Sequence, residues 1–304
     1  MAWIGARASW LLALGVVGAL ILPGPGALLA GTLPFWVALL MMLAMTRVDL
    51  GMILARAIRP RRMATNLIFL AALMCGTPAL FMVLAQLFGV PQGHVEALVY
   101  TSSGPPLGSA TAFCLILGLD AAFALEMTVI GAFLAPLTMP VVARFLLGDA
   151  VPIEVGEMVL RLSILIGAAA IGAVVLRWAL GATRIQKNAL AFDGAGSVCL
   201  VLFLFPLFEG IGGQILAAPM FAALTLLIAI LANTGAQVVS FSVLRPFWGR
   251  DTGGAGALIW GNRNAALALA SLPPDPVLTL YVALYQFPMY FTPLIMRPVV
   301  GAPR

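Results

Sequence analysis

The chain has 304 residues, of which 62% are hydrophobic and 9% are charged, and its net charge is +5. A soluble domain carries about 25% charged residues, and a water-soluble fold of this size could not bury so much apolar side chain. The lipid bilayer is therefore the predicted solvent and partner of the chain. The positive charge does not indicate nucleic-acid binding, because the 16 basic residues form no large patch and lie mostly in short loops.

The three cysteines, Cys75, Cys114 and Cys199, each lie inside an apolar run, and their spacing is not that of a metal site. We interpret them as small packing residues. The sequence thus predicts no disulfide framework, no metal centre and no organic cofactor.

Ten apolar segments are long enough, at about 20 residues each, to cross a bilayer as helices. The first is the weakest, because Pro-Gly-Pro-Gly at 23–26 interrupts it. With Arg7 before it, this segment could instead be a signal peptide ending near Ala27–Ala30. We favour a true span, because the second half of the chain otherwise lacks a full partner. In chain order the predicted spans are 9–28, 33–51, 64–88, 95–118, 121–147, 156–179, 188–208, 214–240, 252–271 and 275–297.

The basic loop residues fall almost entirely on one side of these ten spans. The opposite loops carry mostly acidic residues and the single histidine, His94, which we interpret as solvated. The positive-inside rule makes the basic side cytoplasmic. We therefore predict a multi-pass protein of the cell membrane with both termini in the cytoplasm. The basic residues that decide this are Arg56, Arg59, Arg61, Arg62, Arg184, Lys187, Arg245 and Arg250.

Ten spans divide into two halves of five, residues 1–150 and 151–304. An odd number of spans gives the two halves opposite orientations in the membrane. The expected fold class is therefore an all-α polytopic membrane protein with two inverted five-helix repeats. A pair of prolines marks the last span of each half, at Pro136 and Pro140 and at Pro288 and Pro293.

The fourth and ninth predicted spans are interrupted at matching places. The fourth contains Gly104-Pro105-Pro106-Leu107-Gly108, and the ninth contains Gly261-Asn262-Arg263-Asn264. A break frees backbone N–H and C=O groups, which are costly in lipid unless they face protein, a cavity or a ligand. Simple kinks are the alternative, but two matched breaks indicate the substrate site of a transporter, where the broken helices cross.

Arg263 is the most informative polar residue, because it lies near the middle of the ninth predicted span. A charge there costs at least about 2.5–3.5 kcal/mol on insertion scales and needs a partner, a water cavity or an anionic ligand. A structural ion pair is the alternative. Hydroxyl groups before the first break suit a ligand cavity, or could bond to their own helix. The predicted substrate-binding residues are Arg263, Asn262, Asn264, Thr101, Ser102 and Ser103.

Acidic residues offer partners for these groups. Glu126 lies roughly 9 Å into the fifth predicted span at 1.5 Å per residue, where it could pair with Arg263 or carry a proton. Asp120 precedes that span and is typical of a helix N-cap. Asp193 is interpreted as a rim residue that pairs with a base.

The ninth predicted span contains Ile-Trp-Gly-Asn-Arg-Asn-Ala-Ala-Leu-Ala at 259–268, and the fourth contains Pro105 followed by Pro-Leu-Gly-Ser-Ala-Thr. At these breaks the sequence resembles the bile acid:sodium symporter family, which often has E-V-G-x-Q-N-[SA]-x-L-A and P-G-G-x-x-S-N there. The family's Asn or Asp at the start of the fifth span falls on Asp120, and a hydroxyl in that span falls on Thr128. Its P-x-x-x-P falls on 136–140.

The resemblance implies a core of spans three to five and eight to ten that rocks against a panel of spans one, two, six and seven. It also implies a small or amphipathic organic anion as substrate. In sodium-using members the ion ligands fall on positions that here hold Ile259, Arg263, Leu73 and Ala110-Thr111. A guanidinium cannot ligate a cation, and hard cations prefer oxygen ligands, so sodium coupling is not carried over. The residues left for an ion or coupling role are Thr111, Thr128, Glu126 and Asp120.

We hypothesise that Arg263 supplies the fixed positive charge that bound sodium supplies elsewhere. The first alternative is a proton-coupled or uncoupled carrier in which Glu126 titrates. The second is a membrane sensor or scaffold that does not transport. An enzyme is disfavoured, because the chain contains no G-x-S-x-G, no H-E-x-x-H and no paired intramembrane aspartates.

Overall fold

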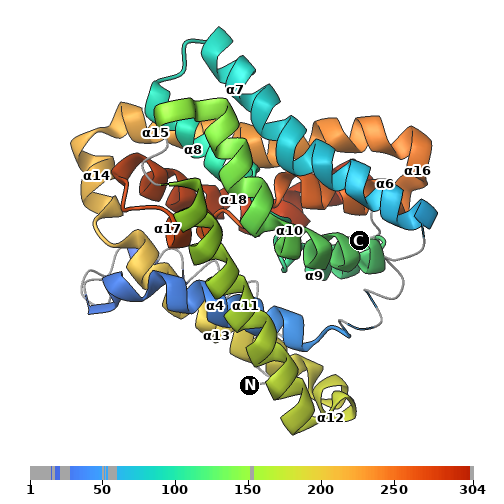
Figure 1. Cartoon of the computed structure of the whole chain (residues 1–304). Coiled ribbons are helices and arrows are strands. Elements are labelled where there is room, and N and C mark those ends of the chain that lie inside the picture. Colours follow the sequence, from blue (N-terminus) through green and yellow to red (C-terminus); the bar gives the residue numbers. More distant parts are fainter. Residues whose placement is uncertain are drawn as a thin grey trace.

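A computed structural model of the chain describes residues 28–49, 60–150 and 154–301, with the isolated positions 15, 18–20, 51 and 53. Within these residues the chain forms helices joined by short loops (Figure 1). The described residues contain no β-strand, and only one isolated β-bridge connects two backbone segments. The predicted first span, 9–28, lies almost entirely outside the described residues.

The length of the helices and the apolar side chains on the surface of the protein both indicate a membrane protein. Five of the described helical stretches are long and apolar enough to cross a bilayer. Large apolar side chains also point outward, and Phe145 and Trp178 are each 85% exposed. Such surfaces are unfavourable in water and match lipid instead. The all-α membrane class predicted from composition is therefore confirmed.

The helices follow the predicted segments closely. α10 has the predicted limits, and α18 differs from its prediction by no more than three residues at either end. The start of the predicted span 214–240 is divided between α14, which ends at Ala217, and α15, which begins at Pro219 because proline suits the first turn of a helix. The helices are α4 (Leu33–Thr46), α6 (Pro60–Ala71), α7 (Thr77–Leu87), α8 (Gln92–Ser102), α9 (Ala110–Leu117), α10 (Ala121–Leu147), α11 (Val155–Leu180), α12 (Ala182–Lys187), α13 (Ala189–Phe208), α14 (Ile211–Ala217), α15 (Pro219–Ile230), α16 (Ala236–Gly261), α17 (Ala266–Ser271) and α18 (Pro276–Val300), with 3-10 turns at Ala30–Thr32 and Gly148–Ala150 and π turns at Ala72–Gly76 and Leu231–Gly235.

α16 contains a sharp corner at Gly249, where φ is 72° and ψ is −175°. A φ of this sign is readily adopted only by glycine. The corner separates the end of the predicted span 214–240 from the start of the predicted span 252–271. One continuous helical stretch therefore holds parts of two predicted spans.

Two groups of helices can be distinguished (Figure 1). α4 packs against α11 and α13. The second group holds α6 to α10 and α15 to α18, which pack on one another through pairs such as α7–α8, α9–α10 and α15–α18. α10 and α17 connect the groups, since both contact α11. Both predicted helix breaks lie in the second group.

Local features recur along the second group at a constant spacing. A helix that begins with proline is interrupted by a π turn, and a later helix ends at a break. A π turn is rare and is often found at functional sites, so two such turns at matching places are informative. The matched pairs lie 159 positions apart and are Pro60 with Pro219, the π turns Ala72–Gly76 with Leu231–Gly235, and the helix ends Ser102 with Gly261.

The recurrence continues after the breaks. α10 begins after Asp120, whose carboxylate accepts a hydrogen bond from the Phe123 amide at 2.9 Å. α18 begins after Asp275, whose carboxylate accepts from the Leu278 amide at 2.6 Å. Both helices also contain internal prolines. The interpretation of Asp120 as a helix N-cap is confirmed.

Candidate functional site

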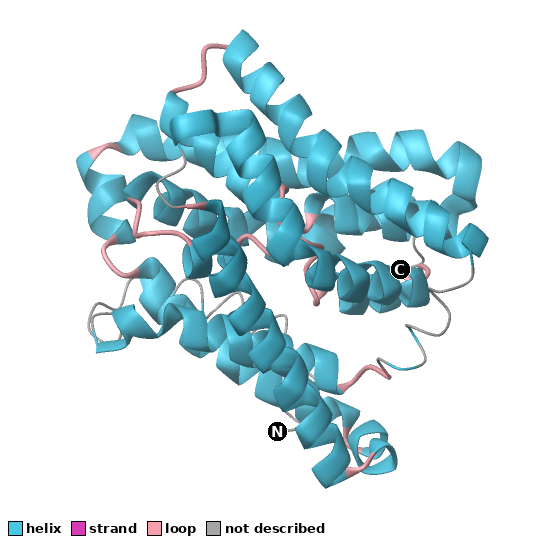
Figure 2. Ribbon diagram, viewed as in Figure 1, coloured by secondary structure: helices cyan, strands magenta, loops and turns pink. Residues whose placement is uncertain are grey.

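The two unwound segments cross and bond to each other through their backbones, as the sequence predicted. Figure 2 colours the interruptions between helices as loops. Pro106 and Arg263 form the isolated antiparallel bridge. On either side of it the Leu107 amide donates to the Asn262 carbonyl, and the Asn264 amide donates to the Pro105 carbonyl, each at 2.9 Å. Backbone groups freed by each break are thus satisfied by the other, which is what the bilayer interior demands.

Glycine makes this close approach possible. A Cβ on Gly104 would lie 3.0 Å from the Thr101 carbonyl oxygen and 3.3 Å from that of Asn264. Across the crossing, a Cβ on Gly131 of α10 would lie 2.8 Å from Cδ of Pro106. Gly108, also predicted at the break, would place a Cβ 3.2 Å from Cβ of Ala44 in α4. Small residues therefore let the backbones meet at this place.

Arg263 is buried at the crossing, with 3% of its surface exposed. Its Nη1 donates to the Gly104 carbonyl at 3.0 Å, and its Nη2 donates to the Leu73 carbonyl. Leu73 lies in the first π turn, where the regular helical hydrogen-bond pattern is interrupted. Nε has no partner. Within the described part of the chain, no carboxylate pairs with this guanidinium, so backbone carbonyls alone compensate its charge.

A buried amide network lies on the other side of the second break. The Asn262 Oδ1 accepts hydrogen bonds from Asn233 Nδ2 and from the Thr292 hydroxyl, both at 3.1 Å. Asn233 Nδ2 also donates to the Gly261 carbonyl at 2.9 Å. Gln237 Nε2 donates to Asn233 Oδ1 at 2.8 Å. The network holds α18 and the second π turn against the end of α16.

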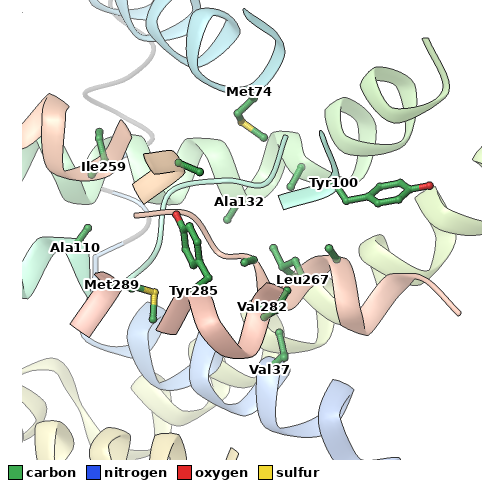
Figure 3. Packing of buried hydrophobic residues seen from close by; sticks show 14 of the residues in the cluster. Val37, Met74, Tyr100, Ala110, Ala132, Ile259, Leu267, Val282, Tyr285 and Met289 are labelled. Atoms are coloured by element: carbon green, nitrogen blue, oxygen red, sulfur yellow. The ribbon is translucent and has the colours of Figure 1, made fainter. Parts of the chain in front are cut away.

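Tyr285 of α18 points at the two unwound segments (Figure 3). Its hydroxyl donates to the Gly261 carbonyl and accepts from the Arg263 amide at 3.3 Å. Tyr281 lies one turn earlier, with its ring stacked on that of Tyr285 at 5.8 Å. Its hydroxyl lies near Thr101, and it has no hydrogen-bond partner among the described residues. The hydroxyl of Tyr285 therefore bonds to the second break, whereas that of Tyr281 does not.

This difference yields a matched prediction. Tyr285→Phe should lower the free energy of unfolding by about 1–3 kcal/mol, because the buried Arg263 amide loses its acceptor. Tyr281→Phe should change stability by less than about 0.5 kcal/mol, since its hydroxyl makes no such bond. Both changes remove one buried oxygen from the same helix. Melting of the two purified variants in detergent compares them, and equal losses would contradict the assignment.

The predicted hydroxyl residues lie beside Arg263 but bond to their own helix. Thr101 donates to the Ala97 carbonyl at 2.7 Å, and Ser102 donates to that of Leu98 at 2.5 Å. Ser103 donates to the Tyr100 carbonyl at 3.0 Å. A cavity of about 10 Å³, at the lower limit for one water molecule, lies here. It is lined by Phe81, Thr101, Ser102, Ala232, Trp260, Arg263, Tyr281 and Tyr285.

The suggestion that Glu126 pairs with Arg263 is wrong. Glu126 is buried, but it accepts hydrogen bonds from Arg62 Nη2 at 2.5 Å and from Asn66 Nδ2 at 2.7 Å. Both partners belong to the start of α6, which lies beside the first turns of α10. Span assignment gives the depth of a residue and not the side of the helix on which it lies, so the neighbouring Arg62 was overlooked.

We predict that replacing the two partners of this ion pair lowers stability by different amounts. The Arg62 side chain is 47% exposed, whereas that of Glu126 is 4% exposed. Arg62→Ala should cost about 1–3 kcal/mol, because it leaves a buried carboxylate with only Asn66. Glu126→Gln should cost less than about 1 kcal/mol, because the freed guanidinium reaches water. Chemical or thermal unfolding in detergent measures both, and a larger loss in Glu126→Gln would contradict this arrangement.

The remaining ion or coupling candidates do not form a common ligand set. Thr128 donates to the Ala124 carbonyl at 2.8 Å, and the Thr111 hydroxyl has no partner among the described residues. Asn264, which was predicted to bind substrate, is half-buried. No hydrogen bond in the described part of the chain connects Thr111, Thr128 and Asn264. Asp120 bonds instead to the Thr252 hydroxyl at 3.0 Å and caps α10.

His94 is not solvated, contrary to the prediction. It lies in α8 and is fully buried. Its Nε2 is 2.8 Å from the Thr225 hydroxyl, and its ring lies 4.6 Å from that of Phe221. Because α8 begins at Gln92, the histidine lies inside the helix and not in the preceding loop. The side chain of Asp193 lies outside the described part of the structure.

Sequence reasoning missed four residues that contact the second break, namely Asn233, Gln237, Thr292 and Tyr285. The first three are amides and a hydroxyl in otherwise apolar spans. Their positions within those spans were the available signal, since a polar group at membrane depth needs a partner. Asn233 in particular lies in the second π turn.

A larger cavity, of about 350 Å³, lies between the ends of α4 and α11. Arg177 and Asp49 line it and pair at 3.2 Å. Its volume is within the range of small-molecule sites. None of the predicted substrate residues lines it, so it is separate from the crossing.

No family model matches the chain, and no curated protein matches it.

Proposed function

We propose that the protein is a secondary transporter that moves a small or amphipathic organic anion across the cell membrane by alternating access. The observation that carries the proposal is the crossing of two broken helices inside an apolar, all-helical chain. Discontinuous helices at the midplane are the usual binding site of secondary transporters, because their free backbone groups face the ligand.

The proposal includes ten spans arranged as two inverted repeats, with both termini in the cytoplasm. The constant spacing of 159 positions between the π turns and between the helix ends supports two repeats. The segment Pro60–Leu87 corresponds to the third span of the first repeat, and Pro219–Ile230 lies in the third span of the second. In the proposed topology these segments cross the membrane in opposite directions.

The moving parts follow the two groups of helices. The group with both breaks, α6 to α10 and α15 to α18, would rock against the group formed by α4, α11 and α13. Rocking of one bundle about a fixed site is the general mechanism of such repeats. The preference for an anion rests on Arg263, a buried positive charge whose compensation comes only from carbonyls among the described residues.

The test is transport by purified protein in liposomes. Labelled taurocholate would serve as the amphipathic anion, and labelled benzoate as the small one. We expect saturable uptake of at least one of them that protein-free liposomes lack. Uptake would be measured with a sodium gradient, with a pH gradient and with neither, which separates coupled from uncoupled transport.

Thermal stabilisation by the same anions is the second measurement, since a ligand that binds the folded state raises its melting temperature. Neither uptake nor stabilisation by any tested organic anion would overturn the proposal. Stabilisation without uptake would favour the sensor or scaffold. Uptake driven by a pH gradient and lost in Glu126→Gln at unchanged stability would favour the proton-coupled carrier.

A further inference from the structure

The crossing is a poor site for sodium, although the resemblance of the sequence implies that ion. A hard cation needs several oxygen ligands at once. The carbonyl oxygens of Gly104 and Leu73 already accept hydrogen bonds from the Arg263 guanidinium. The nearby amide oxygen of Asn262 accepts two more from protein groups. No carboxylate among the described residues completes a set at this place, so sodium does not fit.

The oxygens that Arg263 occupies are nevertheless those that attract a cation. The Gly104 carbonyl follows the end of α8, and the carbonyl end of a helix carries partial negative charge. The Leu73 carbonyl lies in a π turn of the neighbouring span. Unwound carbonyls and half-helix C-terminal ends coordinate the coupling cations of discontinuous-helix transporters. In this protein the Arg263 guanidinium binds these carbonyl oxygens in place of a free cation.

The guanidinium also connects three separate elements. Its own backbone forms the second break, one nitrogen binds the first break, and another binds the π turn between α6 and α7. The planar guanidinium presents its donors in a fixed geometry. A single buried cation therefore joins both halves of the crossing, with 3% of the residue exposed.

We infer that Arg263 is a tethered monovalent cation, which permanently occupies the carbonyl site at the crossing of the broken helices. The wild-type protein therefore needs no free cation to assemble this crossing. Removing the side chain opens a site that accepts free guanidinium. This inference concerns how the crossing is held and not which substrate is moved, so it can fail while the transport proposal stands.

The test is chemical rescue of Arg263→Ala in detergent. Melting would be followed in low millimolar guanidinium chloride, sodium chloride, potassium chloride and choline chloride at matched ionic strength. We expect the variant to melt several degrees lower than wild type. Guanidinium should restore part of that loss saturably, and sodium should restore less, because two carbonyls are too few ligands for it. Wild type should melt equally in sodium and choline.

Two further variants make the result specific. Arg161→Ala removes an arginine that also reaches a backbone carbonyl, that of Ser271 at 3.5 Å, but whose side chain is 42% exposed. It should show no guanidinium response. Arg263→Gln keeps an amide donor and replaces Arg263→Ala if the alanine variant does not fold.

Two outcomes would overturn the inference. One is a saturable, sodium-specific rise in the melting temperature of wild type, which can be measured even if both variants fail to fold. The other is a folded Arg263→Ala protein that melts like wild type or ignores guanidinium, or a folded Arg263→Gln protein that melts like wild type.

Discussion

Arg263→Glu is expected to prevent the protein from folding. The carboxylate would face the Gly104 and Leu73 carbonyl oxygens that now accept from the guanidinium, so two attractive contacts would become repulsive. An uncompensated buried charge alone costs about 3–5 kcal/mol, and the repulsion at the end of α8 adds to it. Since a typical protein is stable by only about 5–15 kcal/mol, little folded protein should remain.

The measurement is size-exclusion chromatography of a fluorescent fusion extracted from membranes. Arg245→Glu is the matched control, because it makes the same charge reversal on an exposed side chain of α16 that lies 5.7 Å from the Phe241 ring. Surface changes of this kind stay within about 0.5 kcal/mol, so the control should give a normal monodisperse peak. A normal peak for Arg263→Glu would mean that the guanidinium does not hold the crossing.

Much of the fold could be predicted from hydrophobicity and from glycine and proline. Apolar runs of about 20 residues locate membrane helices because lipid imposes their length, and α10 has the predicted limits. The breaks were predictable because the run Gly104, Pro105 and Pro106 strongly disfavours a helix, and because Arg263 is too costly in lipid without a role. The length of an apolar run and the cost of burying a charge in lipid can each be read from a single segment of the sequence.

Contacts between segments could not be predicted in the same way. Glu126 pairs with Arg62, which is 64 positions away, and nothing in the periodicity of α10 points to that residue. The π turns were also not predicted, because no residue type demands them. Leu73 is an ordinary apolar residue, yet its carbonyl is one of the two that hold Arg263. The site depends on these backbone groups, which a sequence pattern of side chains does not report.

Gly261 is the position at which a single methyl group should do the most damage. It ends α16, and a Cβ there would collide with the Asn233 carbonyl oxygen and with Cγ of Gln237. The first of these atoms belongs to the backbone of the second π turn and cannot move aside as a flexible side chain can. The methyl group would thus push apart the elements that the amide network and Tyr285 hold together.

We expect Gly261→Ala to lower the free energy of unfolding by about 3 kcal/mol or more, at the upper end of the cost of overpacking. Gly167→Ala in α11 should instead raise it by roughly 0.5–1 kcal/mol, because no atom of the described residues lies within 4 Å of the new methyl group and alanine favours a helix over glycine. Unfolding of both variants in detergent measures the difference. The same substitution should therefore act with opposite signs at the two sites, and a neutral Gly261→Ala would mean that α16 does not pack this closely on the π turn.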